Sequence, residues 1–143
     1  MEESMTYLRE SFALPEVDIR TYSPATLAYI GDAIYDLIIR TILVERGNRS
    51  ANSLHKEASA YVKASAQSAL ADALMDELSE EEQQYFRRGR NAHPASMAKN
   101  ASMHDYRRAT GFEALMGYLY LTGQMTRMID LIRLGLERTG GTP

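Results

Sequence analysis

Apolar residues recur at intervals of three and four along almost the whole chain, and no segment shows the strict alternation of a half-buried strand. This period is typical of amphipathic helices, each of which must bury one face against a neighbour. The clearest helix begins after Ser23, a capping residue, with Pro24 at the first helical position. Gly47 is a stop signal after Arg46. The sequence therefore predicts an all-α helical bundle with a central helix over residues 24–46.

Capping residues and helix breakers divide the rest of the chain into shorter helices. Pro15 ends a first helix, and the run from Ser79 to Glu82 is a capping box that opens a later one. Residues 89–103 have no period and contain glycine, proline and asparagine, so we predict a loop there. The remaining expected helices cover residues 4–13, 53–62, 65–78, 80–88, 105–121 and 126–137.

The length and composition predict one globular domain over residues 1–143, with its core over about residues 23–138. Hydrophobic residues make up 45% of the 143 residues, which is enough for a single core. The absence of cysteine excludes a disulfide scaffold, a cysteine-ligated zinc site and a cysteine nucleophile. No signal peptide is visible, and the longest aliphatic run, Leu37–Ile39, is far too short to span a membrane. We therefore expect a soluble cytoplasmic protein.

Positive charge is concentrated in one part of an acidic chain. The net charge of −3, taken alone, argues against a nucleic-acid partner. Between residues 86 and 108, however, the sequence contains six basic residues and only one acidic residue. Such segregation can make a local surface that attracts anions, although a solvated loop with spare positive charge would have the same composition. The six basic residues are Arg87, Arg88, Arg90, Lys99, Arg107 and Arg108.

Asp32 lies almost opposite the apolar stripe of the helix over residues 24–46, between the small residues Gly31 and Ala33. Other apolar residues share that side of the helix, so its carboxylate needs a pairing partner, a hydrogen bond or a metal ion. A surface aspartate on the wet side of the helix is the simpler alternative.

Glu113 lies within the apolar segment of the helix over residues 105–121. Gly117 lies one turn further along the same face, and because glycine costs a helix about 1 kcal/mol, close packing against another helix is expected there. Two carboxylates on two central helices could converge on one divalent cation, for which Mg²⁺ suits the oxygen ligands. A glutamate at the rim of the core is the alternative. The sequence has no metal-binding histidine spacing, no glycine-flanked nucleophilic serine and no phosphate-binding glycine loop.

Three segments together resemble the ribonuclease III family. LAYIGDAIYDLIIR, residues 27–40, resembles the family's signature helix, and TGFEALMGYLYL, residues 110–121, resembles its later helix with a second metal ligand. Between them, FRRGRNAHPASMAKN, residues 86–100, is similar to a loop of the short branch called Mini-ribonuclease III. The resemblance covers residues 23–121, and the order of the motifs makes it specific.

The resemblance implies that Asp32 and Glu113 are catalytic residues and ligands of Mg²⁺. Larger members of the family use two further acidic residues, at the positions of Ala28 and Thr110 in this sequence. Both are lost here, as they are in the short branch. Larger members also carry a separate domain that binds double-stranded RNA, so the basic segment is left to contact the RNA phosphates.

The fold implied is a single ribonuclease III-like endonuclease domain that forms a two-fold homodimer. The activity implied is Mg²⁺-dependent endonucleolytic cleavage of double-stranded RNA, in maturation of the large-subunit (23S) ribosomal RNA precursor. A non-catalytic RNA-binding relative and a helical interaction module without a nucleic-acid role remain alternatives. The residues expected to bind RNA are Arg87, Arg88, Arg90, Asn91, Lys99, Arg107 and Arg108.

Overall fold

A computed structural model describes residues 2–92 and 102–143, and within these residues all regular structure is helical. The prediction of an all-α chain is therefore confirmed. The elements are α1 (Glu2–Ser11), η1 (Ile19–Thr21), α2 (Pro24–Arg46), α3 (Ala51–Val62), α4 (Ala64–Leu74), η2 (Met75–Glu77), α5 (Glu80–Arg90), α6 (Met103–Leu121) and α7 (Met125–Arg138), where η marks a 3-10 helix.

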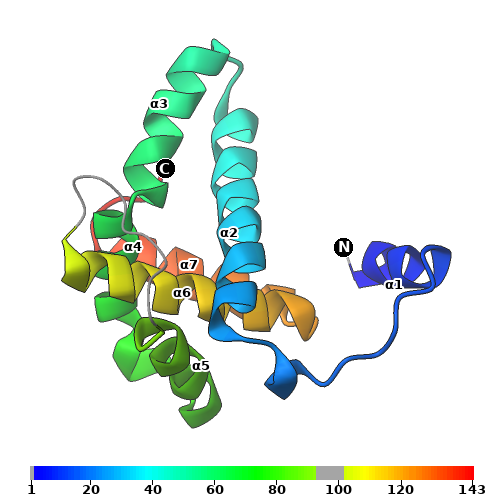
Figure 1. Cartoon of the computed structure of the whole chain (residues 1–143). Helices are drawn as coiled ribbons and strands as arrows, with labels where there is room; N and C mark the ends of the chain where they lie inside the picture. Colours follow the sequence, from blue (N-terminus) through cyan, green and yellow to red (C-terminus); the bar gives the residue numbers. More distant parts are fainter. Residues whose placement is uncertain (1, 93–101) are drawn as a thin grey trace.

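Helix α6 is the most enclosed element of the bundle, and α2, α4, α5 and α7 pack around it (Figure 1). Nine of its 19 residues are buried, and they lie on every side of the helix, as expected of an element in the middle of a core. The sequence pattern suggested instead that the helix over residues 24–46 is central. That helix, α2, buries seven of its 23 residues and leaves Tyr29, Leu37 and Val44 exposed on its outer side.

Helices α2 and α6 touch backbone to backbone at two glycines. A Cβ atom on Gly31 would lie 1.7 Å from the carbonyl oxygen of Glu113, and a Cβ atom on Gly117 would lie 2.0 Å from that of Leu27. No other residue type leaves room for the neighbouring chain at either position. The close packing expected at Gly117 is therefore confirmed, and it brings the two motif helices into direct contact.

Local signals explain most of the helix ends. The Ser23 hydroxyl accepts a hydrogen bond from the Thr26 backbone N–H at 3.1 Å, and the Ser79–Glu82 capping box is present. The helix expected over residues 65–78 is divided into α4 and the 3-10 turn η2, and α5 continues two residues beyond its expected end. Gly89 lies inside this helix because it packs against Gly111, whose Cα would lie 2.8 Å from a Cβ at position 89. Most of the predicted loop, residues 93–101, falls outside the described residues.

The amino-terminal helix α1 lies to one side of the bundle (Figure 1). Tyr7 and Phe12 expose 71% and 70% of their surface, so α1 shares little of the core. The Tyr120 hydroxyl of α6 donates a hydrogen bond to the Met5 sulfur at 3.0 Å, which ties α1 to the end of α6. Among the helices that the structure describes, none is long and apolar enough to cross a membrane.

Candidate active site

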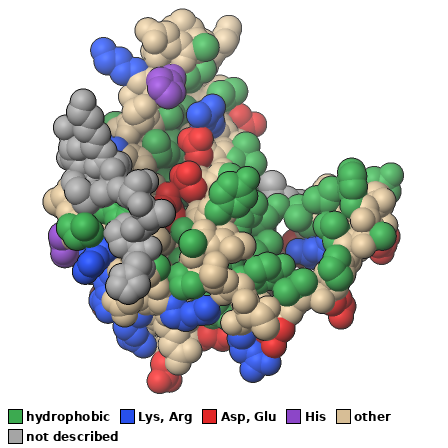
Figure 2. All heavy atoms as spheres, in the orientation of Figure 1, with side chains coloured by type: hydrophobic (Ala, Val, Ile, Leu, Met, Phe, Trp, Pro, Cys, Tyr) green, Lys and Arg blue, Asp and Glu red, His purple; other side chains and the backbone are tan. Residues whose placement is uncertain are grey.

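Asp32 and Glu113 lie next to each other where α2 crosses α6. The contact of Gly31 with the Glu113 backbone fixes the two helices at this level, and Asp32 is the next residue along α2. Asp32 is exposed and Glu113 is half-buried, so the pair is open to solvent on one side only. Figure 2 shows acidic side chains in the hollow between α2 and α3. Two carboxylates that are 81 positions apart in the sequence thus form one site.

The electrostatics of the pair favour a bound cation. Burial, together with the negative charge and hydrogen bonding of Asp32, raises the pKa of Glu113 to about 8, and burial is the largest of these causes. Near neutral pH, Glu113 therefore binds a proton unless another positive charge takes its place. A raised carboxyl pKa caused by burial and a second carboxylate is a common property of functional sites.

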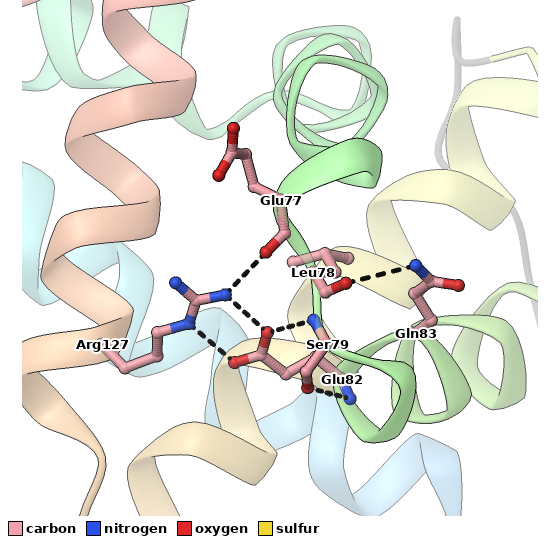
Figure 3. A network of polar contacts seen from close by, with 6 residues as sticks. All are labelled: Glu77, Leu78, Ser79, Glu82, Gln83 and Arg127. Carbon is pink, nitrogen blue, oxygen red and sulfur yellow. Dashed lines mark hydrogen bonds and ion pairs between the residues drawn. The ribbon is translucent and has the colours of Figure 1, made fainter.

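A second enclosed glutamate in the same molecule shows the contrasting case. The buried Glu82 of α5 receives hydrogen bonds from Arg127 Nε at 2.9 Å and from Arg127 Nη2 at 2.8 Å, as well as from the Ser79 backbone N–H (Figure 3). These contacts, above all the hydrogen bonds from Arg127, lower the pKa of Glu82. Glu82 therefore has a structural partner that compensates its charge. Glu113 is placed against another acid instead.

Gln67 of α4 is a buried polar residue that affects the Glu113 carboxyl group, and sequence reasoning missed it. Its side chain is 2% exposed, and its Nε2 donates a hydrogen bond to the Val62 carbonyl oxygen at 2.7 Å. A hydrogen bond from Gln67 lowers the pKa of Glu113, against the stronger effects of burial and Asp32. The Oε1 atom of Gln67 is buried and has no hydrogen-bond partner among residues 2–92 and 102–143. The sequence signal was weak, because a single glutamine in a helix of small residues carries no recognisable pattern.

The oxygen atoms of this site suit a hard divalent cation with few protein ligands. No group of three or more acidic, histidine or cysteine side chains suited to a metal occurs in residues 2–92 and 102–143. Ala28 is buried one turn before Asp32, and Thr110 donates its hydroxyl to the Tyr106 carbonyl oxygen at 3.0 Å. Neither residue adds a carboxylate to the site. Mg²⁺ fits such a donor set because it retains several water ligands and needs only one or two carboxylates.

The predicted RNA-binding arginines lie at the end of α5 and the start of α6. Arg87 and Arg107 are exposed to solvent. A band of basic side chains follows these two elements in Figure 2. Arg90 Nε makes a long hydrogen bond of 3.3 Å to the exposed Asn91, which caps α5. Lys99 lies outside the described residues.

Two of the predicted RNA-binding arginines bond to residues outside α5 and α6. Arg88 donates a hydrogen bond from Nη2 to the Tyr22 carbonyl oxygen at 2.9 Å. Arg108 forms an ion pair with Asp72 of α4, and its guanidinium carbon lies 5.3 Å from the centre of the Phe86 ring. The Arg108 side chain is 12% exposed. These contacts tie α5 and α6 to their neighbours, so Arg87, Arg90 and Arg107 are the arginines with most freedom to meet an anion.

Comparison with known proteins agrees with the motifs. The family described as "Ribonuclease III domain" matches residues 25–124. A Mini-ribonuclease 3 from Thermoanaerobacter sp. (strain X514) is 44% identical over 96% of this chain and 97% of its own length. A Mini-ribonuclease 3 from Symbiobacterium thermophilum is 48% identical over 82% of this chain and 90% of its own length. The crystal structure of a protein from Fusobacterium nucleatum superposes with a TM-score of 0.77 at 30% identity, over 85% of this chain and 98% of that one.

Proposed function

The chain belongs to the ribonuclease III family, as an endoribonuclease of the Mini-ribonuclease 3 branch, and from this premise we propose that Asp32 and Glu113 are its catalytic centre. The observation that supports this most is the contact of the two motif helices, which brings both carboxylates to one half-open site. The substrate that we propose is double-stranded RNA, cleaved with the help of Mg²⁺.

Asp32 and Glu113 would hold the cation through their carboxylate oxygens. A bound Mg²⁺ supplies an activated water, orients the scissile phosphate and stabilises the departing oxygen. The protein holds the two carboxylates in position and keeps solvent away from them on the side that faces the core. Because Glu113 favours a proton when no cation is present, cation binding displaces that proton.

The arginines at the end of α5 and the start of α6 would bind the RNA backbone. A-form RNA presents phosphates and 2′-hydroxyl groups rather than readable base edges in its deep groove, so recognition depends on shape and charge. Arg87, Arg90 and Arg107 are suited to phosphate contacts, while Arg88 and Arg108 support the helices that present them.

A two-fold homodimer would give each strand of the duplex its own active site. The exposed apolar residues on the outer side of α2 support this proposal, because Tyr29 and Val44 expose 80% and 56% of their surface and Leu37 exposes 48%. Each cleavage would leave a 5′-phosphate and a 3′-hydroxyl. The 23S ribosomal RNA precursor is the duplex that we propose as substrate, in the cytoplasm of a bacterium.

The test is cleavage of a duplex RNA by the Asp32→Asn variant in the presence of Mg²⁺. We expect the variant to fold normally and to lose cleavage by at least about 100-fold, because a neutral amide is a poor ligand for Mg²⁺ and losing metal-dependent charge stabilisation costs several kcal/mol. Asp36→Asn, one turn further along α2, is the matched control and should retain activity. Full cleavage by Asp32→Asn would remove Asp32 from the site. Duplex binding without cleavage by the unmodified chain would favour a non-catalytic RNA-binding relative instead.

A further inference from the structure

Helix α1 turns its polar side towards the bundle and its apolar side towards solvent. A hollow of about 300 Å³ lies between α1 and the junction of α6 with α7. Tyr7 lies almost opposite the side of α1 that lines this hollow, and it is 71% exposed. A helix that packs on its own core has the reverse arrangement. The residues of α1 that line the hollow are Glu2, Met5, Thr6 and Arg9.

The apolar surface continues from α1 into the segment before η1. Nine of the ten residues of α1 are exposed, and Met5 is half-buried. Phe12, Leu14 and Val17 expose 70%, 51% and 47% of their surface, and Figure 2 shows hydrophobic side chains gathered over α1. A helix of ten residues is marginal in water by itself, and a contiguous exposed apolar surface marks an interaction site. We call residues 2–17 the arm.

The charge of the arm argues against a polyanionic partner. Residues 2–17 include four acidic residues and one basic residue. A segment with this charge is repelled by RNA phosphates and by an anionic membrane surface. The arm therefore suits a protein partner that has an exposed apolar surface of its own.

The same chain carries such a surface on the outer side of α2. Tyr29, Leu37 and Val44 are exposed and lie on one side of this helix, over a length of about 22 Å at 1.5 Å per residue. Helix α1 is about 15 Å long, and residues 12–17 can extend about 20 Å further, so the arm is long enough to cover this surface.

We propose that the arm of one copy of this chain packs on the outer side of α2 of a second copy. The inference rests on the homodimer of the proposed function. It adds to that dimer a contact from outside residues 25–124, the segment that matches the ribonuclease III domain. Two-fold symmetry then lets each copy cover both exposed surfaces of the other, because the arm and α2 exchange places across the axis.

The exposed side chains are sufficient for an interface of this kind. Tyr7, Phe12 and Tyr29 each expose 70% or more of their surface. At about 150 Å² for each aromatic side chain, the six in a two-fold dimer would cover about 900 Å². The aliphatic residues of the arm and of α2, which are about half exposed, bring the total above the roughly 1,200 Å² of a specific interface.

The primary experiment tests which surfaces meet, by disulfide formation between full-length chains that each carry one introduced cysteine. The sequence contains no cysteine, so the introduced thiols react only with each other. Phe12→Cys is mixed in turn with tagged Tyr29→Cys, Leu37→Cys and Val44→Cys, and the mixture is oxidised. We expect at least one pair to form the mixed disulfide at least about 10-fold faster than the matched control, Thr6→Cys, with the same partner. Thr6 is the control because it faces the chain's own bundle.

Sedimentation velocity measures how much the arm contributes to the dimer. Tyr7→Ser combined with Phe12→Ser should raise the dimer dissociation constant by at least about 100-fold, because aromatic residues dominate the energy of such interfaces. Ile129→Ser is the matched control, since Ile129 of α7 is 48% exposed, as Leu37 is, and lies outside the arm and α2. It should dimerise like the unmodified protein. Circular dichroism should show that these variants stay folded, because the substituted side chains are exposed.

Each other outcome overturns the proposal in a recognisable way. If the arm variant dimerises normally while Leu37→Asp is a monomer, the arm has no role and the proposed dimer stands. If no mixed pair exceeds the Thr6→Cys control, the arm does not contact α2 of a second copy. A disulfide that forms only within a chain carrying both Phe12→Cys and Leu37→Cys would show that the arm packs on its own α2. If the unmodified chain is a monomer at every concentration, the proposed dimer fails and the arm contact fails with it.

Discussion

Replacing Glu113 by glutamine should stabilise the metal-free protein, and the gain should grow with pH. The native state holds the Glu113 pKa at about 8, above the value of 4.5 for a free glutamate, because the carboxyl is buried beside Asp32. A group whose pKa is raised on folding contributes its full stability below the unfolded pKa and loses that stability as the pH rises towards the folded pKa. The free energy of unfolding of the unmodified protein should therefore lose a contribution between about pH 4.5 and pH 8. The free energy of unfolding of Glu113→Gln should not fall in this way, because a glutamine side chain does not ionise.

The size of the effect follows from the shift. Between pH 5 and pH 8, three pH units correspond to about 4 kcal/mol at 1.36 kcal/mol per unit, and the open side of the site reduces this to about 2–3 kcal/mol. The measurement is urea unfolding with EDTA at both pH values, for the unmodified protein and the variant. The stability difference between the two should be small at pH 5 and reach that magnitude at pH 8.

Glu82→Gln is the control with the opposite sign. The pKa of Glu82 is lowered from 4.5, mainly by hydrogen bonds from Arg127, so its ionised form stabilises the fold at every pH above the unfolded value. Glu82→Gln should therefore destabilise the protein by nearly the same amount at pH 5 and at pH 8. Added Mg²⁺ should stabilise the unmodified protein at pH 8 and have little effect on Glu113→Gln. If Glu113→Gln gives no larger gain at pH 8 than at pH 5, the carboxyl pair is not electrostatically strained, and the argument for a cation site loses its basis.

Three further predictions concern the crossing of the helices, the RNA surface and the dimer. Gly31→Ala should lower the free energy of unfolding by at least about 3 kcal/mol, because the added methyl group would overlap the backbone of α6, whereas Gly47→Ala, with open space around it, should change stability by less than about 1 kcal/mol in the same denaturation assay. Arg107→Ala should weaken binding of duplex RNA and reduce the slope of log affinity against log salt by about 1, and an unchanged slope in filter-binding titrations would show that Arg107 meets no phosphate. Leu37→Asp should convert the proposed dimer to a monomer in sedimentation velocity, and a variant that still sediments as a dimer would exclude the outer side of α2 from the interface.

The helices could be predicted from the sequence where the interactions that determine them are local. The cap at Ser23, the capping box at Ser79 and the period of three and four residues act within one helix, so the helices and their order could be predicted. The end of α5 was misjudged because Gly89 suggested a loop by its residue type. In the structure it serves a contact with Gly111, which lies 22 positions away in the sequence.

The residues of the candidate site also fall into two groups, those that a local pattern predicts and those that depend on how the helices pack. Asp32 and Glu113 could be selected because each lies in a recognisable motif, and the structure brings them together. Gln67 and the ion pair of Arg108 with Asp72 could not be found, because both depend on how α4 packs against α6. No period or motif in the sequence determines that packing. Counting charges along the chain gave all six basic residues the same weight, although some of them form contacts with other residues of the bundle.

The loss of acidic residues at positions 28 and 110 is consistent with the electrostatics of the remaining pair. Ala28 is 8% exposed and lies one turn before Asp32, so a carboxylate there would enter the same enclosed region. With only one acidic neighbour, Glu113 already has a pKa of about 8. Each additional carboxylate would raise the pKa of the group further and increase the cost of ionising the site, unless a second cation compensated the charge. Two ionised carboxylates carry the charge of one divalent cation, so the pair that is present matches the single cation proposed above.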